Sequence, residues 1–126
     1  MNYPLIRERV TSGALAGPKG YVISWAVREL EKLGFTEAQL QTGGYVIKTT
    51  LEKKNQDAAV RAMDARGPKK TPDNFQQALV SIRPGTGEIV ALYGGKDYLV
   101  KQLNGATQSI TQAGSSFKPF ALVAAL

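Results

Sequence analysis

Residues 77–93 read QALVSIRPGTGEIVALY, and no other stretch of the 126-residue chain predicts its local structure so directly. Two apolar runs, residues 77–83 and 88–93, flank the tetrapeptide Pro84-Gly85-Thr86-Gly87. Along the first run Ala78, Val80 and Ile82 alternate with Leu79, Ser81 and Arg83. Alternation with a period of two is typical of a strand, and a proline with two glycines is typical of a tight turn. We therefore predict an antiparallel β-hairpin.

Helices are predicted before the hairpin. Over residues 21–33, apolar side chains recur at helical spacing and form one face, which is Ile23, Ala26, Val27, Leu30 and Leu33. Gly34 follows as the expected C-cap, and Thr36 with Gln39 has the spacing of a capping box, which indicates one short helical turn. A second long helix is predicted over residues 52–66, where Gly67-Pro68 ends it. Its expected buried side is Ala58, Ala59, Ala62 and Met63.

The segments between these elements are of three kinds. Residues 1–20 contain prolines and glycines without periodicity and are expected to be an irregular lead-in. Residues 45–51 are rich in aromatic and β-branched side chains, which predicts a strand. Residues 96–114, after the Gly94-Gly95 break, are expected to form a polar loop.

The last predicted element is a helix that begins at Ser115 or Ser116. Pro119 indicates this start, because proline lacks an N–H and is tolerated only in the first turn of a helix. Lys118 then lies about one turn from Ser115 on the same face. An amine at that distance can act as base toward a serine hydroxyl, and a helix N-terminus offers free N–H groups to an oxyanion. The residues after Pro119 are apolar all round, which is typical of a helix inside a larger core.

Composition excludes several kinds of site. The chain has no cysteine, which removes disulfides and thiolate ligands, and no histidine, which removes a serine–histidine–acid triad and histidine metal sites. A nucleophilic serine must therefore use lysine, a carboxylate or tyrosine as its base. We expect neither a metal nor a cofactor. No apolar run approaches the roughly 18–20 residues of a membrane span, and residues 1–10 are too charged for a signal peptide.

Basic residues exceed acidic ones, 16 to 10, which gives a formal net charge of +6. The excess is densest around Lys48, Lys53, Lys54, Arg61, Arg66, Lys69 and Lys70. Two interpretations stay open for this stretch, a solvated basic surface or a surface for an anionic partner. A nucleic-acid platform is not expected, because aromatic residues are not interleaved with the charges.

Residues 114–120, GSSFKPF, resemble the first transpeptidase motif of the penicillin-binding proteins, specifically of the bifunctional class A peptidoglycan synthases. Three other stretches resemble the same family. Residues 42–51, continued by Gln56 and Ala59, resemble the segment that precedes the transpeptidase domain, and residues 78–95 resemble its first hairpin. Asn104, Ala106 and Thr107 match the loop that leads to the serine. The resemblance covers about residues 21–126.

The resemblance implies a reaction and its participants. Ser115 is the expected nucleophile on a D-alanyl-D-alanine stem peptide, and its backbone N–H is one expected oxyanion donor. Lys118 is the expected proton acceptor, or part of the proton path. The implied partners are peptidoglycan stem peptides and β-lactams, which imitate D-Ala-D-Ala. The implied location is the extracytoplasmic face of the bacterial membrane, with an anchor that is missing from this chain.

The chain also departs from the family pattern. The family's Ser-x-Asn and Lys-Thr-Gly motifs do not follow Lys118, no glycosyltransferase domain comes earlier, and Ala113 replaces a frequent proline. We therefore expect a fragment that is inactive when isolated. Its expected parts are a lead-in (1–20), an inter-domain linker (21–74) and the opening of the transpeptidase domain (75–126).

Two other functions remain open at this point. The first is a β-lactamase-like or D,D-carboxypeptidase-like serine hydrolase. The second is a non-catalytic basic binding module in which Ser115 merely caps a helix.

The expected fold class is α+β. We predict that the antiparallel hairpin packs on the C-terminal helix, as in an incomplete transpeptidase or β-lactamase-like domain. A smaller helix–strand–helix linker unit is expected beside it.

Overall fold

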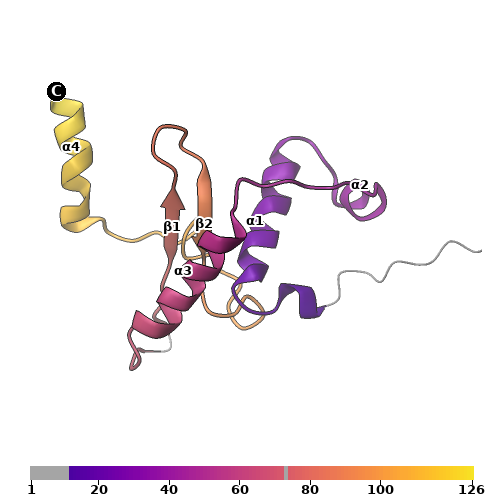
Figure 1. The fold of residues 1–126 in the computed structure, drawn as a ribbon, viewed down its shortest axis with the longest axis horizontal. Helices are drawn as coiled ribbons and strands as arrows, with labels where there is room; N and C mark the ends of the chain where they lie inside the picture. Colours follow the sequence, from indigo (N-terminus) through magenta and orange to yellow (C-terminus); the bar gives the residue numbers. More distant parts are fainter. Residues whose placement is uncertain (1–11, 73) are drawn as a thin grey trace, which may run out of the picture.

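The computed structural model describes residues 12–72 and 74–126, which fold as an α+β unit (Figure 1). Its elements in chain order are η1 (Ser12–Leu15), α1 (Lys19–Lys32), α2 (Glu37–Thr42), α3 (Lys53–Arg66), β1 (Leu79–Ile82), β2 (Ile89–Tyr93), η2 (Gly114–Phe117) and α4 (Lys118–Ala125). The predicted α+β class is confirmed. Residues 1–11 lie outside the described residues. They include most of the expected lead-in and residues 1–10, which were predicted not to be a signal peptide.

The hairpin is confirmed. β1 and β2 pair in an antiparallel register that matches Leu79 with Tyr93 and Val80 with Leu92, and the register shifts between Ser81 and Ile82. The turn closes with a hydrogen bond from the Arg83 N–H to the Glu88 carbonyl at 2.8 Å. Both turn glycines have positive φ, as a reversal of this kind requires.

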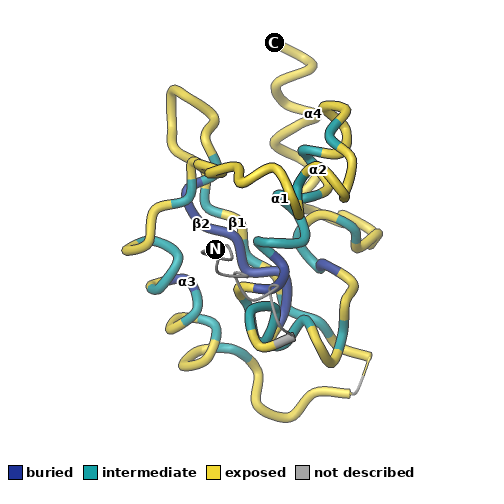
Figure 2. The backbone as a smooth tube through the Cα atoms, turned by 90° about the vertical axis from the view of Figure 1, so that its right-hand side faces the viewer, coloured by how far each residue is buried: buried dark blue, intermediate teal, exposed yellow. Residues whose placement is uncertain are grey.

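The core of the described residues is built around β2. Its last four residues are buried, whereas β1 is half-buried on one face and exposed on the other (Figure 2). α3 packs along β2, and α1 contacts the same strand. The buried apolar residues are Tyr21, Ala59, Val90, Ala91, Leu92 and Tyr93. β2 is therefore covered by helices and not by a second sheet.

The outer edge of β2, opposite β1, is closed by polar groups that precede or begin α3. The Gln56 side-chain amide accepts from the Leu92 N–H at 2.8 Å and donates to the Leu92 carbonyl at 2.7 Å. The Glu52 N–H donates to the Val90 carbonyl at 3.0 Å, and the Thr50 hydroxyl donates to the Ile89 carbonyl at 2.7 Å. Two side chains, those of Gln56 and Thr50, and the backbone N–H of Glu52 thus take the place of a third strand.

The predicted strand over residues 45–51 is wrong. This segment has no strand pairing, and Tyr45, Val46 and Ile47 are exposed, Val46 by 86%. The physical reason is that only its end reaches the edge of β2. α3 begins at Lys53 and turns the chain away, so that Gln56 makes the bonds that a strand would have made.

The helix boundaries follow the prediction, whereas the predicted apolar faces of the helices are buried only in part. α1 buries Gly20 and Tyr21, while Leu33 of the expected apolar face is 75% exposed. α3 buries Ala59, but Ala58 and Ala62 are exposed. The capping box of α2 is confirmed, because the Thr36 hydroxyl accepts from the Gln39 N–H and the Gln39 side chain accepts from the Thr36 N–H.

The predicted packing of the hairpin on the C-terminal helix is also wrong. α4 stands away from the sheet and contacts η2, with all of its residues exposed (Figures 1 and 2). Its large apolar side chains are therefore uncovered, Phe120 by 68%. The helices that pack on β2 are α3 and α1 instead, and they cover the apolar strand that α4 was expected to cover.

Candidate active site

Ser115 and Lys118 lie at the start of the C-terminal helical segment, as predicted. Ser115 is in the 3-10 helix η2, and Lys118 is the first residue of α4. Pro119 occupies the second position of α4, where a missing N–H costs no hydrogen bond. Gly114, directly before the serine, has φ +54°, a conformation that glycine adopts without strain.

Local hydrogen bonds hold this turn. The Ser116 N–H donates to the Ala113 carbonyl at 3.2 Å, and the Ser116 hydroxyl donates to the same oxygen. The Lys118 N–H donates to the Ser115 carbonyl. The Ser116 side chain is thus used by the turn, whereas the Ser115 side chain forms no hydrogen bond with any described residue.

The pair is exposed to solvent. Ser115 and Lys118 are both exposed, and no hydrogen bond joins their side chains in the described part of the chain. Phe117 and Phe120 approach each other on the same segment, with ring centroids 5.9 Å apart. The described residues therefore bring the two predicted site residues onto one helix start but supply no surrounding wall.

The loop before Ser115 is more ordered than the sequence suggested. Asn104 is buried, and its side-chain oxygen accepts from the Ala106 N–H at 3.0 Å. The Gln108 side chain accepts from the Asn104 N–H at 2.9 Å, and the Gly105 N–H donates to the Gly94 carbonyl at 2.8 Å. The adjacent Asn104 and Gly105 are a turn signal in the sequence that could have indicated this order.

Tyr21 and Asp97 were missed altogether by the sequence analysis. The Tyr21 hydroxyl donates to the carbonyl of Asp97 at 3.2 Å and to that of Lys101. The Asp97 carboxylate accepts from the Gly17 N–H at 2.9 Å. Burial raises the pKa of Tyr21, and the negative charge of Asp97 raises it further. A lone tyrosine in an amphipathic helix carries no sequence signal for such a role.

A cavity of about 830 Å³ lies elsewhere, between the end of α3 and the loop after β2. Its lining includes Met63, Phe75, Tyr93 and Lys101, but neither Ser115 nor Lys118. Within residues 12–72 and 74–126, no cluster of acidic side chains could hold a metal ion. Over the same residues, no helix is long and apolar enough to cross a membrane.

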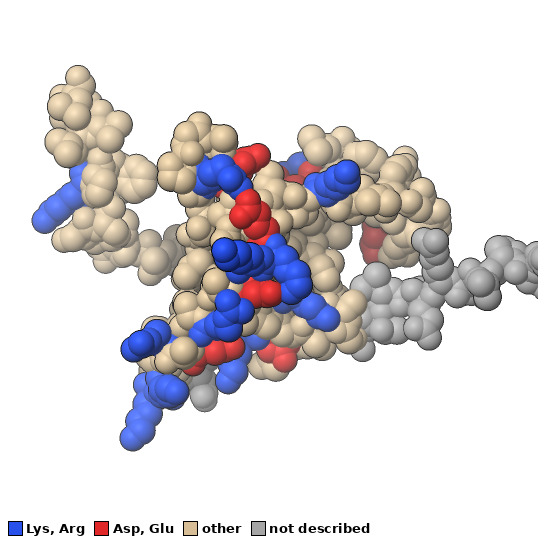
Figure 3. Space-filling model, viewed as in Figure 1, with Lys and Arg blue, Asp and Glu red and all other residues tan. Residues whose placement is uncertain are grey.

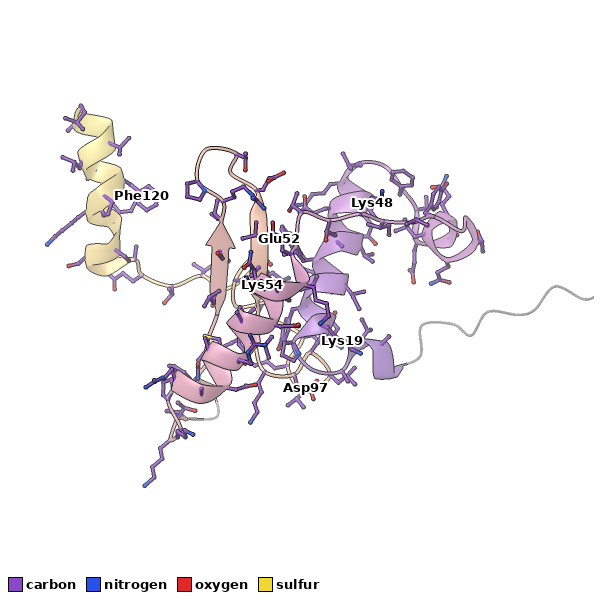
Figure 4. All side chains as sticks on the ribbon, in the orientation of Figure 1. Lys19, Lys48, Glu52, Lys54, Asp97 and Phe120 are labelled. Carbon is purple, nitrogen blue, oxygen red and sulfur yellow. The ribbon has the colours of Figure 1, made fainter. Side chains whose placement is uncertain are left out.

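The basic stretch follows α3 and the loop after it. Lysine and arginine side chains alternate with acidic ones over this part of the surface (Figure 3). Lys53 pairs with Asp57 at 2.6 Å, and both side chains are largely exposed. Lys54 points outward from α3, and Lys48 lies on the segment before it (Figure 4). The surface is mixed in charge, and both interpretations of the basic stretch stay open.

Comparison with known proteins gives the family. The chain is 44% identical over 113 residues to Penicillin-binding protein 1A of Mycolicibacterium smegmatis, and 41% identical over 113 residues to Penicillin-binding protein 1A of Mycobacterium tuberculosis. Each of these alignments includes 87% of the chain. The chain is also 35% identical over 100 residues to Penicillin-binding protein 2D of Bacillus subtilis.

The chain spans only 13–14% of the length of these relatives. No protein-family model and no solved structure matches it. The assignment therefore depends on sequence identity, which holds over most of the chain in several relatives. The chain belongs to the class A penicillin-binding protein family.

Proposed function

We propose that this chain carries the nucleophile of a serine-type D-alanyl-D-alanine transpeptidase, with Ser115 as the acylated residue and Lys118 as its base. The observation that carries the proposal is the local geometry at the start of α4. Ser115 lies one turn before Lys118, Gly114 before it has φ +54°, and Pro119 lies in the first turn of α4, where a helix tolerates proline. The names of the relatives add penicillin binding.

The proposed reaction proceeds through an ester of Ser115. Neutral Lys118 accepts the hydroxyl proton while the serine oxygen attacks the carbonyl carbon of the penultimate D-alanine. The intermediate expels the terminal D-alanine as an amine, which takes the proton back from the lysine. The amine of a second stem peptide then attacks the ester and releases the serine. A β-lactam acylates the same serine oxygen: the ring C–N bond breaks, the nitrogen takes the proton from the lysine, and the nitrogen stays attached to the acyl group, so that no leaving group departs.

Ser116 is the natural comparison for Ser115. The Ser116 hydroxyl donates to the Ala113 carbonyl and helps to close the turn. The Ser115 hydroxyl has no such partner among the described residues, so it is free to react. We therefore assign the chemistry to the first serine of the motif and a structural role to the second.

The isolated 126-residue chain is expected to be inactive. Ser115 and Lys118 are exposed, and the described residues form no binding groove around them. The loss of a single oxyanion donor costs on the order of 10²–10³ in rate. We propose that residues 21–74 are the inter-domain linker, that residues 75–126 open the transpeptidase domain, and that the whole protein acts at the extracytoplasmic face of the membrane.

Labelling with a fluorescent penicillin tests the assignment in the longer protein that carries this chain. We expect Ser115→Ala to abolish the covalent label and Ser116→Ala, the matched control, to keep it. Lys118→Ala is expected to slow labelling on the order of 10²–10⁴-fold, as for the loss of a general base. Labelling of Ser115→Ala at the wild-type rate would overturn the proposal.

The lifetime of the label separates the proposed enzyme from a hydrolase. A transpeptidase keeps the penicilloyl ester for long times, whereas a β-lactamase releases it within a turnover. Rapid release of the label, with hydrolysed penicillin accumulating, would assign the serine to a hydrolase instead.

A further inference from the structure

The cavity between the end of α3 and the loop after β2 has no part in the proposed transpeptidase chemistry, because neither Ser115 nor Lys118 lines it. Its volume of about 830 Å³ lies within the range of about 300–1,000 Å³ that is usual for small-molecule sites. Its wall is assembled from α1, the end of α3, residues 75–77, the end of β2 and residues 95–101. Segments distant in the sequence thus meet around a space of ligand size.

The Tyr93 hydroxyl opens into this cavity. Tyr93, the last residue of β2, lines the cavity and is only 4% exposed, yet its hydroxyl forms no hydrogen bond with any described residue. Among the described residues, every side-chain polar atom that is shut off from solvent has a partner. The Tyr93 hydroxyl must therefore have access to solvent, and the cavity that the residue lines supplies it. Because buried polar groups are bonded as a rule, this hydroxyl is a ready contact for a ligand.

Most other charged groups of the lining are cations. Lys69, Lys96 and Lys101 line the cavity, and none of them forms an ion pair with a described residue. The Lys101 ammonium group donates to the Asn74 carbonyl at 3.2 Å, which limits where this charge can move. Ammonium groups and a hydroxyl donor around one space form a set that suits an anion.

Two aspartates also line the cavity, and they differ in how far they are engaged. The Asp97 carboxylate accepts from the N–H groups of Gly17 and Leu99 at 2.9 and 3.0 Å, so the fold itself uses it. Asp64 forms no ion pair with a described residue. Burial raises the pKa of Tyr93, and the negative charge of Asp64 raises it further, so the hydroxyl keeps its proton and can donate. Asp64 is thus the lining charge expected to weaken the binding of an anion.

The remaining side chains favour an apolar body on the ligand. Met63, Phe75 and Val100 line the cavity together with Tyr93. Met63 is half-buried, whereas Phe75 and Val100 are exposed. A ligand that covers these side chains removes apolar surface from water, and an aromatic ring can also stack on Phe75 or Tyr93.

We propose that this cavity binds a small anion with an apolar or aromatic body, such as an aryl carboxylate. The Tyr93 hydroxyl donates to the anionic group, and the lysines of the lining balance its charge. The proposed ligand site does not depend on the role of Ser115. It also gives a use to one part of the basic stretch, since Lys69 belongs to that stretch. At this position, the cavity favours an anionic partner over a merely solvated surface.

Three naphthalene compounds test the charge of the ligand. Naphthoate, naphthylmethanol and naphthylmethylammonium, substituted at the same ring carbon, carry an anion, a neutral group and a cation on one ring system. We expect the 126-residue chain to bind naphthoate most tightly and the ammonium compound least tightly. Titrations followed by two-dimensional NMR measure the three dissociation constants. Shifts of the Gln77, Gly95 and Lys96 amides, all from the lining, locate the bound ring.

Substitutions in the lining test the roles of single groups. Tyr93→Phe keeps the ring and removes the donor, so it is expected to weaken naphthoate binding on the order of tenfold. Its free energy of unfolding is expected to stay close to that of the wild type, because the hydroxyl bonds to no described residue. Lys96→Gln is expected to weaken binding about two- to fivefold. Asp64→Asn removes the opposing charge and is expected to tighten binding by a similar factor.

Tyr45→Phe and Lys48→Gln are the matched controls, because both residues are exposed and lie outside the lining. Both variants are expected to bind naphthoate as the wild type does. Naphthoate binding that is unchanged in Tyr93→Phe and Lys96→Gln would locate the ring on another apolar surface and overturn the proposed site.

The remaining outcomes also decide. Tighter binding of the ammonium compound, or weaker naphthoate binding in Asp64→Asn, would assign the cavity to a cation and overturn the proposed class of ligand. Absence of naphthoate binding up to its solubility limit would overturn the site itself. None of these results bears on Ser115, whose role is tested separately by penicillin labelling.

Discussion

Gln56 offers a direct test of how this small sheet is stabilised. Its side-chain amide forms two hydrogen bonds with the backbone of Leu92, at 2.7 and 2.8 Å, and Leu92 is fully buried. Gln56→Ala removes both partners and leaves a buried N–H and a buried carbonyl unpaired. Each such group costs about 1–3 kcal/mol, so we expect the free energy of unfolding to fall by about 2–6 kcal/mol. That is a large part of the stability of a small domain.

A second substitution at Gln56 separates the contribution of the hydrogen bond to the Leu92 N–H from that of the bond to the Leu92 carbonyl. Gln56→Glu keeps the acceptor for the Leu92 N–H but faces the Leu92 carbonyl with a carboxylate oxygen. Protonation restores a donor, so the new carboxyl has a raised pKa in the folded state. The loss of stability relative to the wild type is therefore expected to be small below about pH 4 and to grow as the pH rises above the unfolded value of about 4.3.

Urea unfolding of the 126-residue chain, followed by circular dichroism, measures both effects. Gln41→Ala is the control, because Gln41 is an exposed glutamine in α2 whose side chain, among the described residues, bonds to Glu37 alone. It is expected to change stability by less than about 0.5 kcal/mol. If Gln56→Ala also stays within about 0.5 kcal/mol at an unchanged m-value, the side chain does not stabilise the edge of β2 and the reasoning is refuted.

Two further predictions concern the loop after β2. A Cβ atom at Gly94 would lie 2.4 Å from the Asn104 side-chain oxygen, so Gly94→Ala is expected to destabilise the chain by about 1–3 kcal/mol in urea unfolding. Gly13→Ala serves as the control, because a Cβ atom there meets no described atom within 4 Å. The pKa of Tyr21 is raised above 10.0 by burial and by Asp97, so the folded chain keeps a proton that the unfolded chain releases. The free energy of unfolding should then fall above about pH 10, by up to about 1.4 kcal/mol per pH unit. Tyr21→Phe should flatten this dependence of stability on pH between about pH 9 and 11. Equal pH dependence in the variant and the wild type would contradict the raised pKa of Tyr21.

The elements that could be predicted from the sequence are those specified locally. The hairpin follows from alternation and from a turn whose glycines have positive φ, and the capping box follows from the spacing of Thr36 and Gln39. The start of the last helix follows from Pro119. In each case the determining contacts lie within a few residues of one another, so local chemistry is sufficient.

The features that could not be predicted depend on partners distant in sequence. Residues 45–51 have strand-like composition, but the edge of β2 bonds to the Gln56 side chain instead. A single glutamine in a helix gives no sequence signal that it will bond to the edge of a strand. Tyr21 stands far from Asp97 in the sequence, yet the two meet through α1. α4 is apolar enough for a core, but composition alone does not say which surface covers it.

In the candidate site too, the features specified locally could be predicted from the sequence and those that depend on distant residues could not. The spacing of Ser115 and Lys118 was readable because both residues belong to one helix start. The order of the loop around Asn104 was not, because Gln76 bonds to the Gly94 and Leu103 carbonyls from before the hairpin. Sequence reasoning thus found the proposed reactive pair and missed the contacts that order the loop before it.

The closure of one edge of β2 by a side chain has a consequence for how this sheet can be extended. A glutamine amide satisfies one N–H and one carbonyl and offers nothing beyond them, so no strand can be added on that side. Among the described residues, nothing pairs with the far edge of β1, where Val80 and Ile82 are exposed. The sheet can therefore be extended at one edge, and any further strand must pair with β1 (Leu79–Ile82).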